Sequence, residues 1–421
     1  MSLKKDATTV GSANATADFK GHWNAILPPI TAGSYDLIVS ASDTLVLHDV
    51  DFGDVFLMIG QSNLIMPFGK TDRFMPIPTA QQTKHRWFQV KQRLDSLPST
   101  MVAGHWQQIA INDLDNMPAL PYYFDRELSL QTKAPVGLVV SGFGGTPILS
   151  WLPPNLFLRK KNGGWVASTV YNAMLYPLVG LSVAGIIWYQ GEGDLFAPER
   201  YSADLTNFVQ SLRALWHDDS LPIFIVQLPS FGQRVQNEAS SNWAQIRESQ
   251  AQVAKRQNAT LVVTCDTARS NEPEIHPNRK YELGKRLGTV VATVLYNKQT
   301  VTQPEITQKL GAGKIELHFD RPLNGTDVTS GFSIAGQDHN FMPASVKLHP
   351  SGHAISLWND SLPKPEAARY AWADNPYCGL FDQQTRLPIS PFRTDKWTLR
   401  ANNKNIEQYV NAQMMQKKPP N

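Results

Sequence analysis

Between residues 51 and 297 the chain repeats one pattern, in which a short apolar run is followed by a longer amphipathic stretch. The apolar runs lie at residues 55–59, 136–140, 183–189, 221–228 and 260–264, and the helix-like stretches at 170–178, 203–216, 242–257 and 279–295. Near-continuous apolar runs are typical of parallel strands that are covered on both faces of a sheet. The alternation therefore predicts an α/β domain with a three-layer sheet over residues 51–297.

The sequence on either side of this region favours β structure. Residues 1–50 contain strand-like segments at 22–27, 35–39 and 44–47, which are too few for a stable domain. We therefore expect this segment to pack on a later part of the chain or to be part of a longer β domain. After residue 298, short apolar segments at 314–319, 332–334, 345–348 and 354–358 predict a β-rich domain that continues to residue 421.

Two further segments stand out from this pattern. Residues 68–125 are rich in Gln, Pro and Trp and are long for a connection, so we interpret them as an insertion near the functional site. Residues 408–421 are polar and are expected to be frayed.

The composition argues against several classes of function. The net charge is only +3 and no dense run of Lys or Arg occurs, so nucleic acid is not an expected partner. No run of eighteen apolar residues exists, so no membrane span is predicted. The ten histidines are scattered without metal-ligand spacing, so neither a metal nor another cofactor is expected. For Cys265 and Cys378 we expect two buried free thiols rather than one long-range disulfide.

Residues with catalytic chemistry follow the predicted strands. Because the carboxyl ends of parallel strands meet at one edge of a sheet, residues that follow different strands are expected to converge there. The segments are Gly60-Gln61-Ser62-Asn63, Gly144-Gly145-Thr146-Pro147, Gln190-Gly191-Glu192 and Glu274-Ile275-His276. Each alone has an ordinary structural explanation, such as a turn or a helix start. Together they supply a nucleophile, a base and amide donors, which is the set that acyl transfer needs.

The chemistry of an ester assigns a role to each of these groups. The Ser62 hydroxyl needs a base to take its proton, and His276 has a suitable pKa range for that task. The oxyanion of the tetrahedral intermediate needs hydrogen-bond donors. We expect these donors to be the backbone N–H groups of Ser62 and Gly145 and the side-chain amide of Gln190. Glycine at position 145 lets its amide approach the substrate without a Cβ in the way.

These motifs, together with Trp188-Tyr189 before Gln190 and Pro277 after His276, resemble the sialate O-acetylesterase family of SGNH-type hydrolases. The likeness continues through residues 221–229, 369–372 and 390–395 and covers nearly the whole chain. The resemblance implies a flavodoxin-like catalytic domain that is flanked by β domains. It also implies an acetylated carbohydrate substrate, above all O-acetylated sialic acid, and metal-free removal of its acetyl groups through a serine acyl-enzyme. In this family Ser62 corresponds to the nucleophile and His276 to the base.

The resemblance leaves the third catalytic group open, because Glu274 stands where the family usually has aspartate. The acid that orients His276 is Glu274, Glu272 or Asp266, or a backbone carbonyl takes this role. Further residues near the motifs are expected to bind substrate: Gln61, Asn63, Glu192 and Trp151. Exported members are common in the family, which implies a periplasmic or secreted protein whose leader and first strands are absent from this chain.

Other functions remain as alternatives. The same chemistry suits acetylated xylan or pectin, whereas sialate requires a cation for the sugar carboxylate. The candidate cations are Arg126, Arg269, Arg279 and Arg393. A non-catalytic sugar-binding protein on a hydrolase scaffold has no need of Ser62 and His276, so their presence favours an enzyme. A lipase is disfavoured because no long apolar lid segment occurs, and the sequence predicts no oligomeric state.

Overall fold

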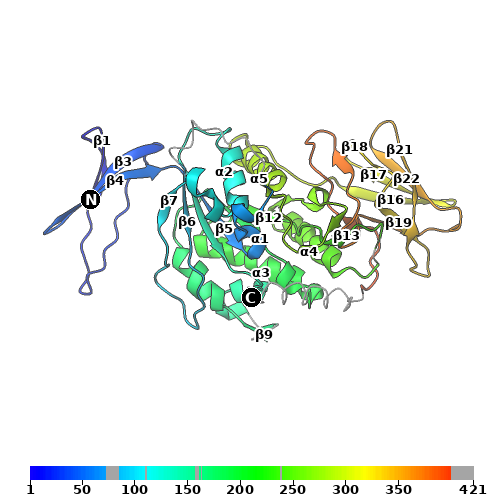
Figure 1. The fold of residues 1–421 in the computed structure, drawn as a ribbon, viewed down its shortest axis with the longest axis horizontal. Helices are drawn as coiled ribbons and strands as arrows, with labels where there is room; N and C mark the ends of the chain where they lie inside the picture. Colours follow the sequence, from blue (N-terminus) through cyan, green and yellow to red (C-terminus); the bar gives the residue numbers. More distant parts are fainter. Residues whose placement is uncertain (73–84, 110, 157–160, 163, 238, 400–421) are drawn as a thin grey trace.

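The computed structural model describes residues 1–72, 85–109, 111–156, 161–162, 164–237 and 239–399. The segment predicted to be frayed, 408–421, and residues 73–84 of the predicted insertion lie outside the described residues. The described chain is elongated, with a small N-terminal sheet at one end, an α/β region in the middle and a β region at the other end (Figure 1).

A seven-stranded sheet forms the centre of the molecule, in the order β14-β12-β11-β5-β8-β6-β7. Its strands are β5 (Asp54–Gly60), β6 (His85–Gln89), β7 (Trp106–Gln108), β8 (Val136–Gly142), β11 (Gly185–Tyr189), β12 (Ile223–Val226) and β14 (Thr260–Val262). All neighbouring strands are parallel except β6 and β7, which pair antiparallel. The five predicted strands are all present. The segment interpreted as an insertion contributes two more strands, β6 and β7, to one edge of the sheet.

Helices cover both faces of this sheet, which explains why its strands are apolar throughout. In β5, Phe56 and Met58 face one core cluster, whereas Leu57 and Ile59 face the other. The first cluster is closed by α2 (Ala119–Leu128) and α5 (Lys280–Leu295), and the second by α3 (Pro198–Trp216) and α4 (Asn242–Arg256). The segment expected to be helical at 170–178 forms the short turns η5 (Tyr171–Leu175) and η6 (Tyr176–Leu178). The predicted three-layer α/β fold is confirmed.

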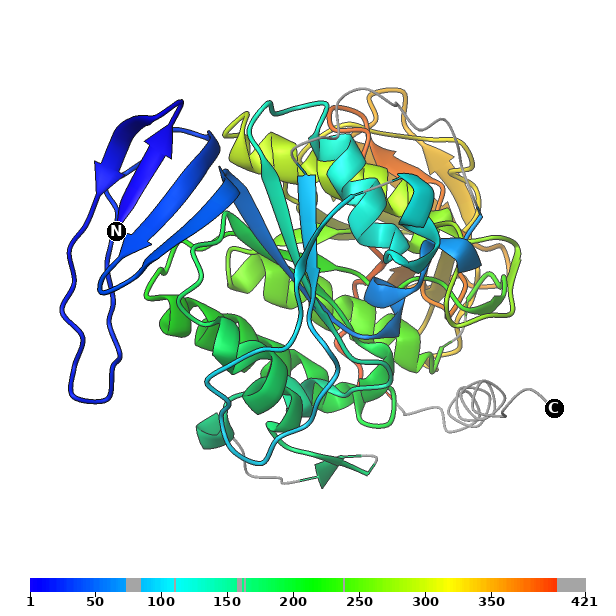
Figure 2. The same ribbon diagram turned by 60° about the vertical axis from the view of Figure 1, so that its left-hand side comes forward.

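The N-terminal segment forms an antiparallel sheet in the order β2-β1-β3-β4. Its strands are β1 (Ser2–Lys5), β2 (Thr8–Ser12), β3 (Gly33–Ser40) and β4 (Thr44–Phe52). The strands predicted at 35–39 and 44–47 are confirmed, but the strand predicted at 22–27 is wrong. Those residues lie in a long loop that extends away from the body of the molecule (Figure 2). The side chain of Ile26 in this loop is 85% exposed, so the burial that stabilises a strand is missing there.

The C-terminal β region is a sandwich with one core. One sheet has the order β16-β17-β22-β21 and the other β20-β19-β23-β25, with the pair β18-β24 beside them. The strands are β16 (Ile306–Gly311), β17 (Lys314–Phe319), β18 (Leu323–Gly325), β19 (Phe332–Ala335), β20 (Met342–Pro343), β21 (Ser345–Leu348), β22 (Ala354–Trp358), β23 (Ala367–Tyr370), β24 (Leu380–Asp382) and β25 (Phe392–Arg393). Ile315 and Leu317 of β17 share one buried cluster with Phe332 and Ile334 of β19. The four strands predicted in this region are confirmed.

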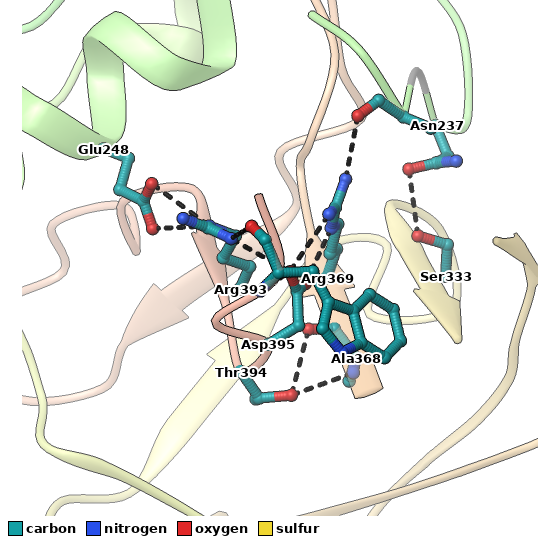
Figure 3. Close-up of polar contacts among 10 residues, drawn as sticks. Asn237, Glu248, Ser333, Ala368, Arg369, Arg393, Thr394 and Asp395 are labelled. Atoms are coloured by element: carbon teal, nitrogen blue, oxygen red, sulfur yellow. Dashed lines mark hydrogen bonds and ion pairs between the residues drawn. The ribbon is translucent and has the colours of Figure 1, made fainter. Parts of the chain in front are cut away.

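The sandwich is joined to the α/β region by a disulfide and by a charged cluster. Cys265 and Cys378 form a disulfide with a Cα–Cα distance of 6.2 Å, so the prediction of two free thiols was wrong. The two cysteines are 113 residues apart, and only the packing of the sandwich against β14 brings them together. Figure 3 shows the charged cluster, in which Arg393 contacts Glu248 of α4 with an Nε–Oε1 distance of 3.0 Å. Asp395 lies between Arg393 and the buried Arg369 and pairs with both.

Candidate active site

The end of β5 presents Ser62 at the carboxyl edge of the sheet. A Cβ at Gly60 would lie 2.1 Å from the carbonyl oxygen of Tyr189, so only glycine fits where β5 ends against β11. The chain then turns and begins the single helical turn α1 (Ser62–Ile65). Ser62 is its first residue, so its backbone N–H has no acceptor within the helix.

Ser62 and His276 meet as the sequence predicted. The distance from Ser62 Oγ to His276 Nε2 is 2.7 Å, although 214 residues separate them in the chain. His276 lies in the loop between the short strand β15 (Asn271–Glu272) and α5. Burial, with smaller contributions from the positive charges of Lys280 and Lys70, lowers the pKa of His276 to about 4. The imidazole is therefore neutral at pH 7, which is the state that a base for the serine hydroxyl requires.

The Ser–His pair opens into a cavity of about 620 Å³. Its lining residues are Ser62, Ile65, Met66, Pro67, Lys70, Arg269, Glu272, Pro273, Glu274, His276 and Asn278. The cavity is therefore formed by the segment after β5 on one side and by the histidine loop on the other. A volume of this size accommodates a sugar ring with an attached acyl group.

Two of the three expected oxyanion donors remain candidates. A Cβ at Gly144 would lie 3.6 Å from Ser62 Cβ, so the Gly144-Gly145 turn lies directly beside the nucleophile. Gly145 has a φ of +72°, a conformation that favours glycine. These positions suit the backbone N–H groups of Ser62 and Gly145 for binding an oxyanion.

The third expected donor, Gln190, has no amide hydrogen available for an oxyanion in the structure. Its Nε2 donates to the Thr146 carbonyl at 2.9 Å and to Asp194 Oδ2 at 2.7 Å, so both amide hydrogens are in use. Its Oε1 accepts from the Tyr201 hydroxyl at 3.1 Å. The side chain is fully buried and holds the Gly145 turn in place instead of facing the substrate.

The acids that could orient His276 have different surroundings. Glu274 has an exposed side chain and lines the cavity. Glu272 is buried and accepts the backbone N–H of Arg269 at 3.3 Å. Asp266 is held by Arg286 through two hydrogen bonds of 2.7 and 2.6 Å. The bidentate pair directs Asp266 toward α5.

The four expected substrate-binding residues are not among those that line the cavity. All four are buried, with an exposed fraction of 1% for Gln61 and 0% for Asn63, Glu192 and Trp151. Trp151 donates from Nε1 to Thr146 Oγ1 at 2.9 Å. Asn63 donates to Glu192 Oε1 at 2.5 Å. These side chains support the loops that carry the reacting groups.

Two lysines near the site were missed from the sequence. Lys70 is exposed and lines the cavity. Lys280 is buried and donates from Nζ to Asn63 Oδ1 at 2.6 Å. A lysine in the first turn of an amphipathic helix opposes the helix dipole and is ordinarily solvent-exposed. The single sequence signal for Lys280 is its position four residues after His276.

In the part of the chain that the structure describes, no group of three or more His, Cys, Asp or Glu side chains is placed to hold a metal ion. None of the described helices is both long and apolar enough to cross a membrane.

A serine and a neutral histidine lie at the carboxyl edge of a parallel sheet, beside glycine N–H groups, which is an arrangement that suits an α/β hydrolase. Residues 52–293, more than half of the chain, match the family described as "Carbohydrate esterase, sialic acid-specific acetylesterase". The chain belongs to this family and is a carboxylic ester hydrolase. The resemblance predicted from its motifs is confirmed.

Individual relatives agree with this assignment. The sialate O-acetylesterase of Homo sapiens is 26% identical over 430 residues, which cover 88% of this chain and 81% of that protein. The enzyme of the same name from Mus musculus is 25% identical over 455 residues, covering 88% of this chain and 83% of that protein. The crystal structure of XAC1771, described as a novel carbohydrate acetylesterase from Xanthomonas citri, is similar with a TM-score of 0.82 and 29% identity. That similarity covers 94% of this chain and 93% of the solved one.

Proposed function

We propose that this protein removes O-acetyl groups from sugar hydroxyls, with Ser62 as the nucleophile and O-acetylated sialic acid as the substrate. The observation that carries the proposal is the 2.7 Å contact between Ser62 Oγ and His276 Nε2 at the floor of an open cavity. Membership of the carbohydrate esterase family supports the acetylated carbohydrate.

The geometry supports a two-step acyl transfer. Ser62 Oγ attacks the acetyl carbonyl carbon while His276 Nε2 takes the hydroxyl proton. The N–H groups of Ser62 and Gly145 bind the oxyanion of the tetrahedral intermediate, and the loss of one such donor costs about 10²–10³ in rate. His276 then returns the proton to the sugar oxygen as the C–O bond breaks. In the second step His276 takes a proton from water, and the resulting hydroxide attacks the acetyl-serine. His276 returns this proton to Ser62 Oγ as the bond to the acetyl group breaks, which releases acetate and restores the free serine.

We assign the orienting role to Glu274, because it lines the cavity beside His276 while Asp266 is paired with Arg286. Replacing Glu274 by Gln removes the charge and keeps the size of the side chain. We expect a lower kcat and a changed acid limb of the pH–rate profile. An unchanged profile would move this role to Glu272 or to a backbone carbonyl.

Two cations at the cavity support sialic acid over a neutral acetylated sugar. Lys70 and Arg269 both line the cavity, and a sialic acid carboxylate needs a cationic partner. Arg269 also pairs with Asp72, so Lys70 is the stronger candidate of the two. The other arginines considered from the sequence lie elsewhere: Arg393 joins the cluster with Glu248, Arg279 pairs with Glu282, and Arg126 lies over the Tyr281 ring. The two mammalian relatives are themselves named sialate O-acetylesterases.

A secreted or periplasmic location belongs to the same proposal. The disulfide between Cys265 and Cys378 supports it, because such bonds persist in oxidising compartments and are rare in the cytosol.

The experiment that tests the function combines one variant with a substrate panel. We expect Ser62→Ala to hydrolyse p-nitrophenyl acetate at less than about a tenth of the wild-type rate, because the nucleophile is gone. Ser361→Ala, at an exposed position in the C-terminal region, is the matched control and should keep wild-type activity. Circular dichroism checks that both variants are folded. A Ser62→Ala variant that kept its activity would refute the mechanism.

The panel measures acetate release from O-acetylated sialic acid, acetylated xylan and acetylated pectin. Preferential release from sialic acid is the expected result. Preference for xylan or pectin would overturn the choice of substrate, and no release from any of them would favour a sugar-binding protein.

A further inference from the structure

Behind the Ser–His pair lies a buried polar network that acyl transfer does not directly require. It consists of Lys280 of α5, Asn63 of α1 and Glu192 of the short turn η7 (Glu192–Asp194). Lys280 is 1% exposed and the other two are fully buried. Burying two opposite charges in this way is costly unless they are compensated and hydrogen-bonded, so the network calls for an explanation.

Asn63 connects the two reacting residues through its side chain. Its Nδ2 group donates to Glu192 Oε1 at 2.5 Å and to the carbonyl oxygen of Ile275 at 3.0 Å. Asn63 directly follows Ser62, and Ile275 directly precedes His276. The amide therefore ties the turn that carries the nucleophile to the loop that carries the base.

Lys280 is one of three groups that fix the direction in which this amide points. An ammonium group only donates hydrogen bonds, so the Lys280 Nζ contact of 2.6 Å requires the oxygen end of the Asn63 amide to face it. The carboxylate of Glu192 and the carbonyl of Ile275 only accept, so they require the NH₂ end to face them. With an apolar side chain at position 280, the amide oxygen loses its donor, and only the two acceptors still select this orientation.

We infer that Lys280 is a positioning residue for the reaction: it helps to orient Asn63, which holds the histidine loop against the nucleophile, and in acid solution it places a positive charge behind His276. This inference rests on the proposed function, because it assigns Lys280 a role in the chemistry of Ser62 and His276.

The charges around Lys280 and His276 agree with this role. Lys280 is faced by Glu192 of η7 and Glu272 of β15, and its Nζ lies 5.8 Å from the centre of the Tyr189 ring of β11. His276 is faced by Ser62 of α1, Lys280 of α5 and Lys70 of the turn η1 (Phe68–Lys70), and Glu272, Glu274 and Arg269 line the same cavity.

Burial lowers the pKa of Lys280 to about 7, so the ammonium is charged in the acid range where His276 titrates. Burial also raises the pKa of Glu192 to about 6. In acid solution the positive charge of Lys280 opposes protonation of His276 and keeps the base neutral.

The direct test is Lys280→Met, which removes the charge and keeps the length of the side chain. We expect kcat for p-nitrophenyl acetate to fall by about tenfold or more with a smaller change in KM, because the reacting groups are misplaced. We also expect the acid limb of kcat/KM to move to higher pH by roughly half a unit or more, because a repelling charge is lost. Lys285→Met, at an exposed position of the same helix, is the matched control and should match the wild type in both.

A second variant separates positioning from simple support of the fold. Lys280→Met leaves Glu192 without its partner, so Lys280→Met/Glu192→Gln removes both charges together. We expect the double variant to regain thermal stability toward the wild type, while its acid limb stays displaced.

The inference is overturned if either variant shows the wild-type acid limb and a kcat within about twofold of the wild type. That outcome leaves the proposed function intact, because the Ser62→Ala variant and the substrate panel test that function separately.

Discussion

The two β regions at opposite ends of the molecule are attached to the α/β region in different ways (Figure 1). The N-terminal sheet continues from β4 into β5, and Arg86 of β6 pairs with Asp49 and Asp51 of β4. Most side chains of β4 are exposed, including Leu45 and Leu47. The N-terminal sheet is therefore attached at the amino end of β5, whereas Ser62 follows the carboxyl end of that strand.

The C-terminal sandwich is instead connected by hydrogen bonds to the loops that carry the active site. Arg247 of α4 is fully buried and donates to the carbonyls of Leu228 and Pro229 in the α/β region and to those of Ala373 and Asp374 near the sandwich. Asn375 donates from Nδ2 to the Gly232 carbonyl at 2.7 Å and to the Arg269 carbonyl at 3.0 Å.

Together with the disulfide at Cys265, these bonds hold the loop after β12 and the segment after β14 that leads to His276. The comparison indicates that the sandwich is part of the support of the active site, whereas the N-terminal sheet is not.

The largest expected effect comes from Arg247, because the comparison depends most on its hydrogen bonds to both regions. We expect Arg247→Met to lower the free energy of unfolding by roughly 3 kcal/mol or more, because several buried carbonyl oxygens lose the charged donor that Arg247 supplies. Chemical denaturation measures this change. Arg256→Met, at the exposed C-terminal end of the same helix, is the control, and we expect a change below about 0.5 kcal/mol. Equal effects of the two variants would show that the sandwich is not held through this residue.

Loss of the disulfide should have an intermediate effect on stability and should also lower kcat. We expect the double variant Cys265→Ser/Cys378→Ser to lose roughly 2–4 kcal/mol of stability, because the link between distant segments constrains the unfolded chain. We also expect kcat to fall, because Cys265 lies at the start of the segment that leads to His276.

A reductant provides the control for the disulfide. It should lower the stability of the wild type and leave the double variant unchanged. A double variant with full activity would show that the sandwich stabilises the fold without positioning the histidine loop.

The sequence predicted the sheet well because its strands are buried on both faces, and burial leaves a clear apolar pattern. The same logic placed Ser62 and His276 together, since the carboxyl ends of parallel strands meet at one edge of the sheet. The sequence was less informative where a polar residue is buried. Asn63 and Glu192 were expected to bind substrate, because a polar residue beside a nucleophile has the same appearance in a sequence whether it faces a ligand or a buried lysine.

The remaining wrong predictions have a related cause. At these positions the structure depends on tertiary contacts, which a local sequence pattern does not show. The disulfide depends on how the sandwich packs against β14, and no local pattern encodes that contact. Gln190 was expected to bind the oxyanion, but Asp194 and the Thr146 carbonyl use both of its amide hydrogens. The strand predicted at 22–27 has apolar residues but no surface that buries them, and propensity alone does not stabilise a strand.

The smallest expected effect concerns Arg86 and the attachment of the N-terminal sheet. Arg86 is partly exposed and has two partners. Asp49 is 58% exposed, so solvent screens that pair, whereas Asp51 is 10% exposed. We expect Arg86→Met to change the free energy of unfolding by less than about 1 kcal/mol and to leave kcat within about twofold of the wild type. Denaturation and p-nitrophenyl acetate hydrolysis measure both quantities. If this variant lowered kcat as much as loss of the disulfide, the N-terminal sheet would also support the catalytic loops. The contrast between the two ends of the molecule would then be one of exposure alone.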